Sequence, residues 1–152
     1  MNSRVEIYFA GLQQIVEAAL AYSEIYSKAK KTIYIVDNYI GMKTLHLLKA
    51  SKPGVEVIIF SDNIGNMLSQ SDYNDYMSEY GYPSISFRQT AGKIHDRYII
   101  LDYKSKSEKI YHCGASSKDA GKRTTSISLA EDNTYYHNLV DTLLQNPELI
   151  LK

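Results

Sequence analysis

Residues 32–60, TIYIVDNYIGMKTLHLLKASKPGVEVIIF, contain the pattern that decides the fold. The runs at 32–36 and 55–60 are apolar and rich in β-branched residues but too short for helices, so each is predicted to be a buried strand. Residues 41–51 between them have helical spacing, which ends at the Lys-Pro-Gly sequence of 52–54. A strand, a helix and a strand in this order predict two parallel strands joined by a right-handed crossover.

The alternation of helices and strands continues on both sides of this unit. Apolar spacings of three and four predict further helices, and short alternating or continuous apolar runs predict further strands. The runs at 94–101 and 109–113 are joined by a short polar loop, which suits an antiparallel hairpin. We therefore predict an α/β domain with a mixed β-sheet flanked by helices. The additional elements are helices at 12–31, 64–80 and 134–144 and strands at 85–89, 94–101, 109–113 and 124–130.

The composition describes one ordinary domain spanning residues 1–152, with 44% hydrophobic residues, which excludes wholesale disorder. The single cysteine, Cys113, excludes a disulfide framework and any CxxC zinc or redox motif. No apolar run reaches the roughly 18 to 20 residues of a membrane span, and the start MNSRVEIYFAG lacks the pattern of a secretory signal. We expect a soluble, cytoplasmic protein without a membrane partner.

The net charge is zero, with 17 basic and 17 acidic residues, but the charges are unevenly distributed. Residues 88–123 hold nine basic and four acidic residues, which leaves +5 in this segment and −5 in the remainder of the chain. Taken alone, such a charge run is usually a solvated face, so the other residues of the segment must decide whether it contacts a polyphosphate. The nine basic residues are Arg88, Lys93, Arg97, Lys104, Lys106, Lys109, Lys118, Lys122 and Arg123.

The predicted topology brings polar residues together where the parallel strands end, which is where open α/β sheets bind ligands. Asp37 follows the first of these strands. If the strand from residue 94 runs antiparallel to them, His95 begins at the same end and the return strand brings residues 114–117 back to face it. Side chains alternate along a strand, so His95 and Arg97 are predicted to share one face. An imidazole beside a guanidinium is suited to handling phosphate.

The stretch 95–102, HDRYIILD, resembles the signature of the phospholipase D superfamily, His-x-Lys followed by four residues and Asp, with Arg97 in place of the lysine. Residues 114–117, GASS, and Glu131 fall at distances similar to the Gly-Ser-x-Asn element and the acidic residue of that superfamily. No asparagine follows the two serines; the equivalent position falls within residues 117–119. The order of strands and helices also resembles one half of the phospholipase D fold, so the chain looks like a phospholipase D-like single-motif domain.

This resemblance implies a metal-independent phosphodiesterase that works through a phosphohistidine. Among phosphodiesterases, we expect a nuclease. His95 would be the nucleophile, and a second imidazole must protonate the leaving oxygen. Because the sequence has one copy of the motif, we predict a homodimer with a shared active site and paired His95 residues. Arg97 would neutralise the phosphoryl oxygens, Ser116 would donate a hydrogen bond, and Glu131 would hold one imidazole nitrogen protonated.

The remaining candidates are assigned to substrate binding or to structure. Asp102 is predicted to cap the hairpin as a structural member of the motif. No cofactor is expected, and no metal site, because adjacent residues such as His112 and Cys113 point to opposite faces of a strand. The predicted substrate-binding residues, for nucleic acid or another phosphodiester, are Asp37, Gly114, Ser117, Lys118, Lys122 and Arg123.

A second hypothesis belongs to a different class of function. The missing asparagine and the arginine at position 97 also suit a catalytically weak phospholipase D-like module that binds nucleic acid or mediates protein assembly. Replacing His95 with alanine separates the two, since the change would abolish an enzyme and spare a binding module.

Overall fold

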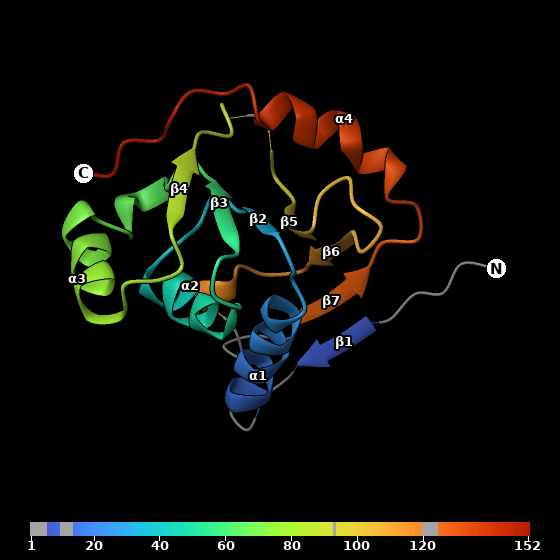
Figure 1. Cartoon of the computed structure of the whole chain (residues 1–152), viewed down its shortest axis with the longest axis horizontal. Coiled ribbons are helices and arrows are strands. Elements are labelled where there is room, and N and C mark those ends of the chain that lie inside the picture. Colours follow the sequence, from blue (N-terminus) through green and yellow to red (C-terminus); the bar gives the residue numbers. More distant parts are fainter. Residues whose placement is uncertain (1–5, 10–13, 93, 120–124) are drawn as a thin grey trace.

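The computed structural model describes residues 6–9, 14–92, 94–119 and 125–152. These residues form one mixed sheet with seven strands in the order β1-β7-β6-β5-β2-β3-β4, and helices lie on both of its faces (Figure 1). Strands β2, β3 and β4 are parallel to one another, whereas β5 is antiparallel to β2 and β6, and β7 is antiparallel to β6 and β1. The predicted α/β class with a mixed sheet is therefore confirmed.

The strands are β1 (Glu6–Phe9), β2 (Thr32–Val36), β3 (Glu56–Phe60), β4 (Ile85–Arg88), β5 (Arg97–Leu101), β6 (Lys109–Cys113) and β7 (Thr125–Leu129). The α-helices are α1 (Gln14–Ser27), α2 (Met42–Leu47), α3 (Gln70–Tyr80) and α4 (Thr134–Leu143). Three short 3₁₀ helices, η1 (Leu48–Ala50), η2 (Ile64–Asn66) and η3 (Ser117–Asp119), complete the described elements.

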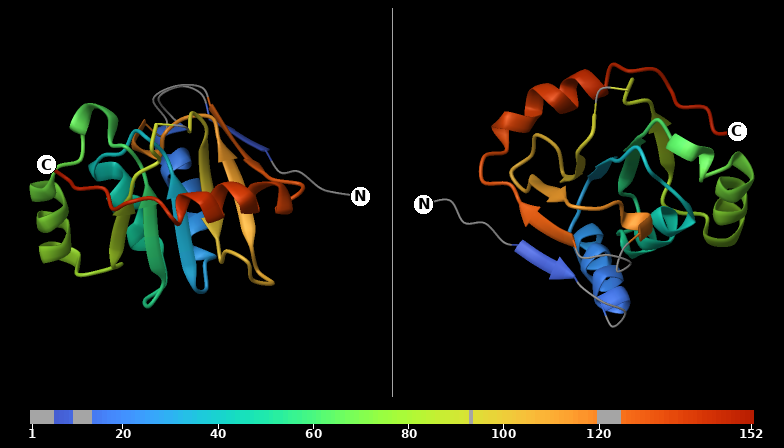
Figure 2. Two further views of the ribbon diagram at one scale, coloured as in Figure 1. Left: turned by 90° about the horizontal axis from the view of Figure 1, so that it is seen from above. Right: turned by 180° about the vertical axis from the view of Figure 1, so that it is seen from behind.

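The alternation of side chains along the central strands produces two apolar layers. On β5, Ile99 and Leu101 enter the larger core beneath α1, α2 and α3, whereas Ile100 enters a smaller core beneath α4. Figure 2 shows α4 lying across the strands on the face opposite α1. Each fully buried aliphatic side chain contributes about 1.5 to 3 kcal/mol to folding, so both layers hold the sheet in place.

Four elements differ from the predicted ones. The helix predicted at 64–80 begins at Gln70, because Ser69 caps its N-terminus by accepting from the backbone N–H of Asp72. The first helix ends at Ser27 rather than at residue 31, because the backbone N–H groups of Lys30, Lys31 and Thr32 donate to the Asp102 carboxylate instead of continuing the helix. Strand β5 begins at Arg97 rather than at residue 94 and pairs with β2, not with the strand that precedes it in the sequence. Strand β1 was not predicted; it pairs with β7 at the margin of the sheet.

Candidate functional site

Three chain segments meet at the end of the sheet where the parallel strands finish, called here the site end. Val36 at the end of β2 pairs with Tyr98 near the start of β5, and Arg97 pairs with Cys113 at the end of β6. The residues just beyond these pairs, Asp37 and Ser116, therefore lie beside Arg97 although they are far apart in the sequence. This juxtaposition follows from the antiparallel placement of β5 that the sequence predicted.

The Arg97 guanidinium is held by a short chain of hydrogen bonds. Its Nε donates to Ser116 Oγ at 3.0 Å, and Ser116 Oγ donates in turn to Asp37 Oδ1 at 2.8 Å. Arg97 Nε lies 3.8 Å from the same carboxylate oxygen. Within the described residues, the two terminal nitrogens of Arg97 make no hydrogen bond, so the fork of the guanidinium is available to an oxyanion.

Asp37 is the buried anchor of this chain. Only 4% of the residue is exposed, and burial raises the pKa of its carboxyl from 3.8 to about 6. The backbone N–H of Tyr39, the Ser116 hydroxyl and the Arg97 charge each lower that pKa, without overcoming the cost of burial. Asp37 therefore takes up a proton at a higher pH than an ordinary aspartate does, even though a cation is close by.

A cavity of about 370 Å³ opens beside Arg97. Gly114 and Ser116 line it, as do Tyr39, whose ring lies 5.8 Å from the Arg97 guanidinium carbon, and Lys118. Lys118 Nζ lies 2.8 Å from Asp119 Oδ2, so a neighbouring carboxylate already partly neutralises this cation. The hydroxyl of Ser117 is buried and, among the described residues, has no hydrogen-bond partner.

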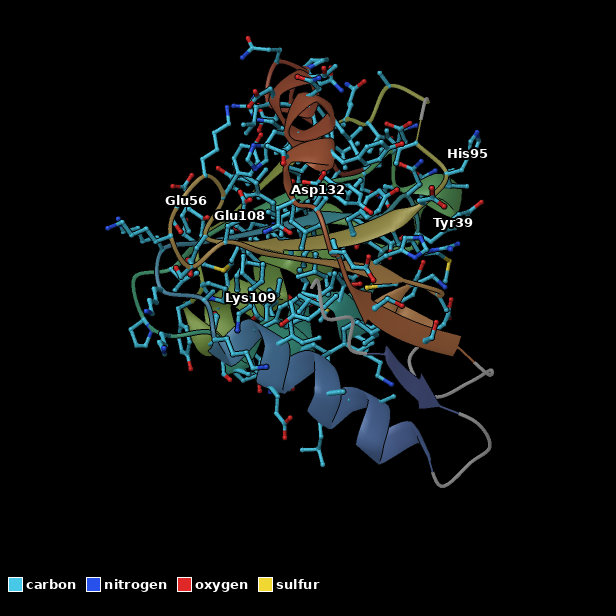
Figure 3. The ribbon with its side chains drawn as sticks, turned by 90° about the vertical axis from the view of Figure 1, so that its right-hand side faces the viewer. Tyr39, Glu56, His95, Glu108, Lys109 and Asp132 are labelled. Carbon is cyan, nitrogen blue, oxygen red and sulfur yellow. The ribbon has the colours of Figure 1, made fainter. Side chains whose placement is uncertain are left out.

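His95 is exposed at the same end of the sheet, near Tyr39 in Figure 3, whereas Glu56 and Lys109 lie at the opposite end. It lines a separate cavity of about 480 Å³ together with Tyr98 and Tyr135 on the α4 side. The expectation that His95 shares a face with Arg97 and faces residues 114–117 is therefore wrong for this conformation. The reason is local: β5 starts at Arg97, so strand alternation does not extend back to His95.

Asn38 and Asp62, which follow the parallel strands β2 and β3, anchor the loop leading to His95. Asn38 Nδ2 donates to the carbonyl of Ile94 at 2.8 Å, and Asn38 Oδ1 accepts from Thr90 Oγ1. Asp62, which follows β3, accepts from the backbone N–H groups of Thr90, Ala91 and Gly92. The available signal was their position, since both follow parallel strands, where short polar side chains commonly bind loop backbone.

Other predicted residues lie away from Arg97. Asp102 sits at the opposite end of β5 and is only 2% exposed. Its carboxylate accepts from three backbone N–H groups, of Lys30, Lys31 and Thr32, and from the hydroxyl of Ser107. Burial raises its pKa, but these donors outweigh burial, so its pKa is lowered overall.

Glu131 follows β7 at the end of the sheet opposite Arg97, because β7 runs away from the site end. It lines a cavity of about 510 Å³ that also contains Asp96 and His112, but not His95. The structure thus does not bring Glu131 to the imidazole of His95. Lys122 and Arg123 lie outside the described residues. No group of three or more histidine, cysteine, aspartate or glutamate side chains in the described part of the chain is arranged to hold a metal ion.

Comparison with solved structures shows what the fold resembles. NucT from Helicobacter pylori superposes with a TM-score of 0.65 at 14% identity, over 98% of this chain and 100% of that one. Nuc from Salmonella typhimurium, a phospholipase D family member, superposes with a TM-score of 0.59 at 16% identity, over 97% and 99% of the two chains. TrmBL2, an archaeal chromatin protein with a novel mode of DNA binding, gives 0.54 at 16% identity, over 92% of this chain and 48% of that one.

These similarities show that the chain has the phospholipase D-like fold that its His-x-Arg motif predicted. No protein-family model and no curated protein sequence matches the chain. None of the helices in the described residues is long and apolar enough to cross a membrane.

Proposed function

We propose that this chain is a metal-independent phosphodiesterase that cleaves nucleic acid as a homodimer. The observation that carries the proposal is the Arg97 guanidinium, held by Ser116 and Asp37, at the same end of the sheet as the exposed imidazole of His95 (Figure 3). The relatives in fold support it, because they include a phospholipase D family member and a DNA-binding chromatin protein.

The chemistry assigns one role to each group. A neutral His95 nitrogen attacks phosphorus, a P–N bond forms, and the P–O bond to the leaving oxygen breaks as the protonated His95 of the second subunit gives that oxygen its proton. Water then attacks the phosphohistidine, the P–N bond breaks, and the second imidazole takes the proton of the water. Arg97 stabilises the charge on the equatorial phosphoryl oxygens throughout.

The Arg97 site as described requires one adjustment for this reaction. His95 and Arg97 line separate cavities, so the His95 side chain must turn toward Arg97 when a phosphodiester binds. The residue is exposed and lies in a loop, where rotamer changes take place within nanoseconds. The anchors at Asn38 and Asp62 keep the backbone of this loop in place during that movement.

The separation of His95 from Arg97 also favours a second candidate, a module that binds nucleic acid without cleaving it. One experiment decides between them. A fluorescently labelled single-stranded DNA is incubated with the parent protein and with the His95→Ala variant, with and without a chelator. The enzyme hypothesis expects cleavage that survives the chelator and falls by at least about 10³ in the variant. Binding without cleavage by the parent protein supports the module instead.

The homodimer has its own test. Sedimentation at micromolar protein concentration is expected to show a dimer. Mixing His95→Ala subunits with parent subunits is expected to reduce activity, because the shared site of each mixed dimer lacks one imidazole. A monomer that retains full activity contradicts the paired-histidine mechanism.

A further inference from the structure

The face of the sheet beneath α4 carries a group of aromatic rings that the proposed reaction does not use. Tyr98 comes from β5, and Tyr135 and Tyr136 come from the first turn of α4; these three residues are called the tyrosine shelf. The ring centroids of Tyr98 and Tyr136 are 5.2 Å apart, and those of Tyr135 and Tyr136 are also 5.2 Å apart, both pairs edge to face. His112 of β6 adds a fourth ring, 5.4 Å from Tyr98.

The shelf is open to solvent at Tyr135. This side chain is 79% exposed, more than any other large hydrophobic residue in the described part of the chain. Aromatic rings are usually covered in a folded domain, because burying one removes a large apolar area from water. Tyr135 instead presents its ring at the mouth of a cavity, where a planar ligand can stack on it.

The shelf is continuous with the surroundings of His95. The cavity of about 510 Å³ and the cavity of about 480 Å³ share Asp96 and all three tyrosines, and His95 lines the second. In Figure 3, His95 and Asp132, which precedes α4, both lie on the side of the sheet that carries this helix. A nucleotide whose phosphate reaches His95 would therefore place its base over the shelf.

The charges around the three tyrosines suit a base better than a phosphate as their ligand. Its cavities are lined by the carboxylates of Asp96, Glu131 and Asp132 and, within the described residues, by no lysine or arginine. Asp96 accepts a hydrogen bond from the Tyr98 hydroxyl at 3.1 Å, and Asp132 accepts from Thr134. Glu131 makes no hydrogen bond or ion pair in the described part of the chain. An ionised carboxylate only accepts hydrogen bonds, so the matching ligand is a flat, uncharged ring system with N–H donors.

We propose that the tyrosine shelf is a nucleobase subsite for single-stranded nucleic acid, with a preference for bases that carry amino groups, guanine first. This inference rests on the proposed function and names the part of the substrate that the acidic face recognises. Guanine presents adjacent ring N–H and amino donors, which suit one carboxylate, whereas thymine presents a single ring N–H flanked by two carbonyl oxygens that a carboxylate repels. Bases inside a duplex are stacked and paired, so only an unpaired strand can place a base on the shelf.

The test measures binding rather than cleavage. The probes are two fluorescein-labelled DNA octamers, oligothymidylate and the same strand with guanine at the fourth position, and the protein carries His95→Asn so that no cleavage interferes. Fluorescence anisotropy is expected to show tighter binding of the guanine octamer by about fivefold or more. Tyr135→Ala is expected to weaken binding of that octamer about tenfold, since the variant loses the aromatic ring on which the base stacks.

Three further variants make the result specific. Tyr135→Phe keeps the ring and is expected to bind like the parent, whereas Glu131→Gln is expected to lower the preference for guanine several-fold. Tyr82→Ala is the matched control, because Tyr82 is a 42% exposed tyrosine before β4 that lines neither cavity. It is expected to change neither affinity nor preference.

The outcomes separate this inference from the proposed function. Cleavage by the parent protein together with unchanged binding in Tyr135→Ala overturns the subsite and leaves the phosphodiesterase standing. Guanine preference that depends on Tyr135, without cleavage by the parent, supports the subsite and overturns the enzyme. A Tyr135→Ala variant that changes from dimer to monomer in sedimentation identifies the shelf as a subunit contact and also overturns the subsite.

Discussion

Two buried aspartates at opposite ends of the same sheet show how different surroundings give one residue type opposite properties. Asp102 receives three backbone N–H groups and a hydroxyl, and its pKa is lowered despite burial. Asp37 receives one backbone N–H and one hydroxyl, with Arg97 at 3.8 Å, and its pKa is raised to about 6. A buried carboxylate whose oxygens accept several hydrogen bonds stabilises the fold, whereas a buried carboxylate with few hydrogen-bond donors is typical of a functional site.

The largest expected effect concerns the cation beside Asp37. Arg97→Ala removes the group that faces the reacting phosphoryl oxygens, so we expect turnover to fall by about 10² to 10³ with little change in nucleic-acid affinity. Arg97→Lys keeps the charge and is expected to retain a large part of the activity. Steady-state kinetics together with anisotropy of bound DNA separate the two quantities. Normal turnover by Arg97→Ala would make Arg97 an ordinary strand residue.

The next effect concerns the opposite end of the sheet. Asp102→Ala leaves three backbone N–H groups without their acceptor, and we expect the free energy of unfolding to fall by about 2 to 4 kcal/mol. Urea denaturation at pH 7 measures this loss. Because the pKa of Asp102 is lowered in the folded state, its contribution is present above the unfolded pKa and is lost as pH falls through the folded pKa. The difference between parent and variant should therefore shrink in acid.

Asp37→Asn is expected to raise the free energy of unfolding, whereas Asp102→Ala lowers it. Between pH 3.8 and about 6 the folded state binds the Asp37 proton more tightly than the unfolded state does, so stability falls as pH rises through this window. Asparagine keeps the acceptor oxygen without the charge. We expect the variant to be more stable than the parent by about 2 to 3 kcal/mol above pH 6 and equal to it below pH 4. Equal stability of the two proteins at pH 8 would show that Arg97 compensates the buried charge fully.

The smallest effect concerns the basic residues of segment 88–123, of which Lys109 lies at the end of the sheet opposite His95 (Figure 3). We expect log affinity for nucleic acid to fall linearly with log salt, with about three to five phosphates engaged. Lys122→Ala or Arg123→Ala should lower this slope by about one unit and leave turnover intact. Lys118→Ala should lower it by less, because Asp119 already neutralises part of that charge. A titration of binding against salt compares the three variants directly.

The sequence predicted the central fold because its periodicities were local and unambiguous. The parallel strands, the β5–β6 hairpin and helix α4 were all found within a few residues of their observed bounds. It also predicted that residues 114–117 return to the end of the sheet where Asp37 lies, since this follows from strand direction alone. Side-chain alternation fails where a strand has not yet begun, which is why the placement of His95 was wrong.

Long-range contacts explain the other differences. The early end of α1 depends on Asp102, which lies some seventy residues further along the chain. The sequence near the end of the helix therefore does not indicate where the helix stops. The direction of β7 decides that Glu131 lies far from Arg97, although its spacing from the motif suited a catalytic role. The tyrosine shelf joins residues from β5 and α4. From the sequence alone, these tyrosines are interpreted as ordinary packing residues.

The Asp102 contacts also bear on the order in which the molecule assembles. They close loops of 70 to 72 residues between the segment after α1 and the end of β5. Closing such a loop lowers the entropy of the chain before any contact compensates for the loss. These hydrogen bonds are therefore expected to form late, after β2 has paired with the nearby β3. Until residue 102 emerges from the ribosome and β5 inserts beside β2, three amide groups of the first half lack their acceptor. The two halves of the chain therefore complete their folding together.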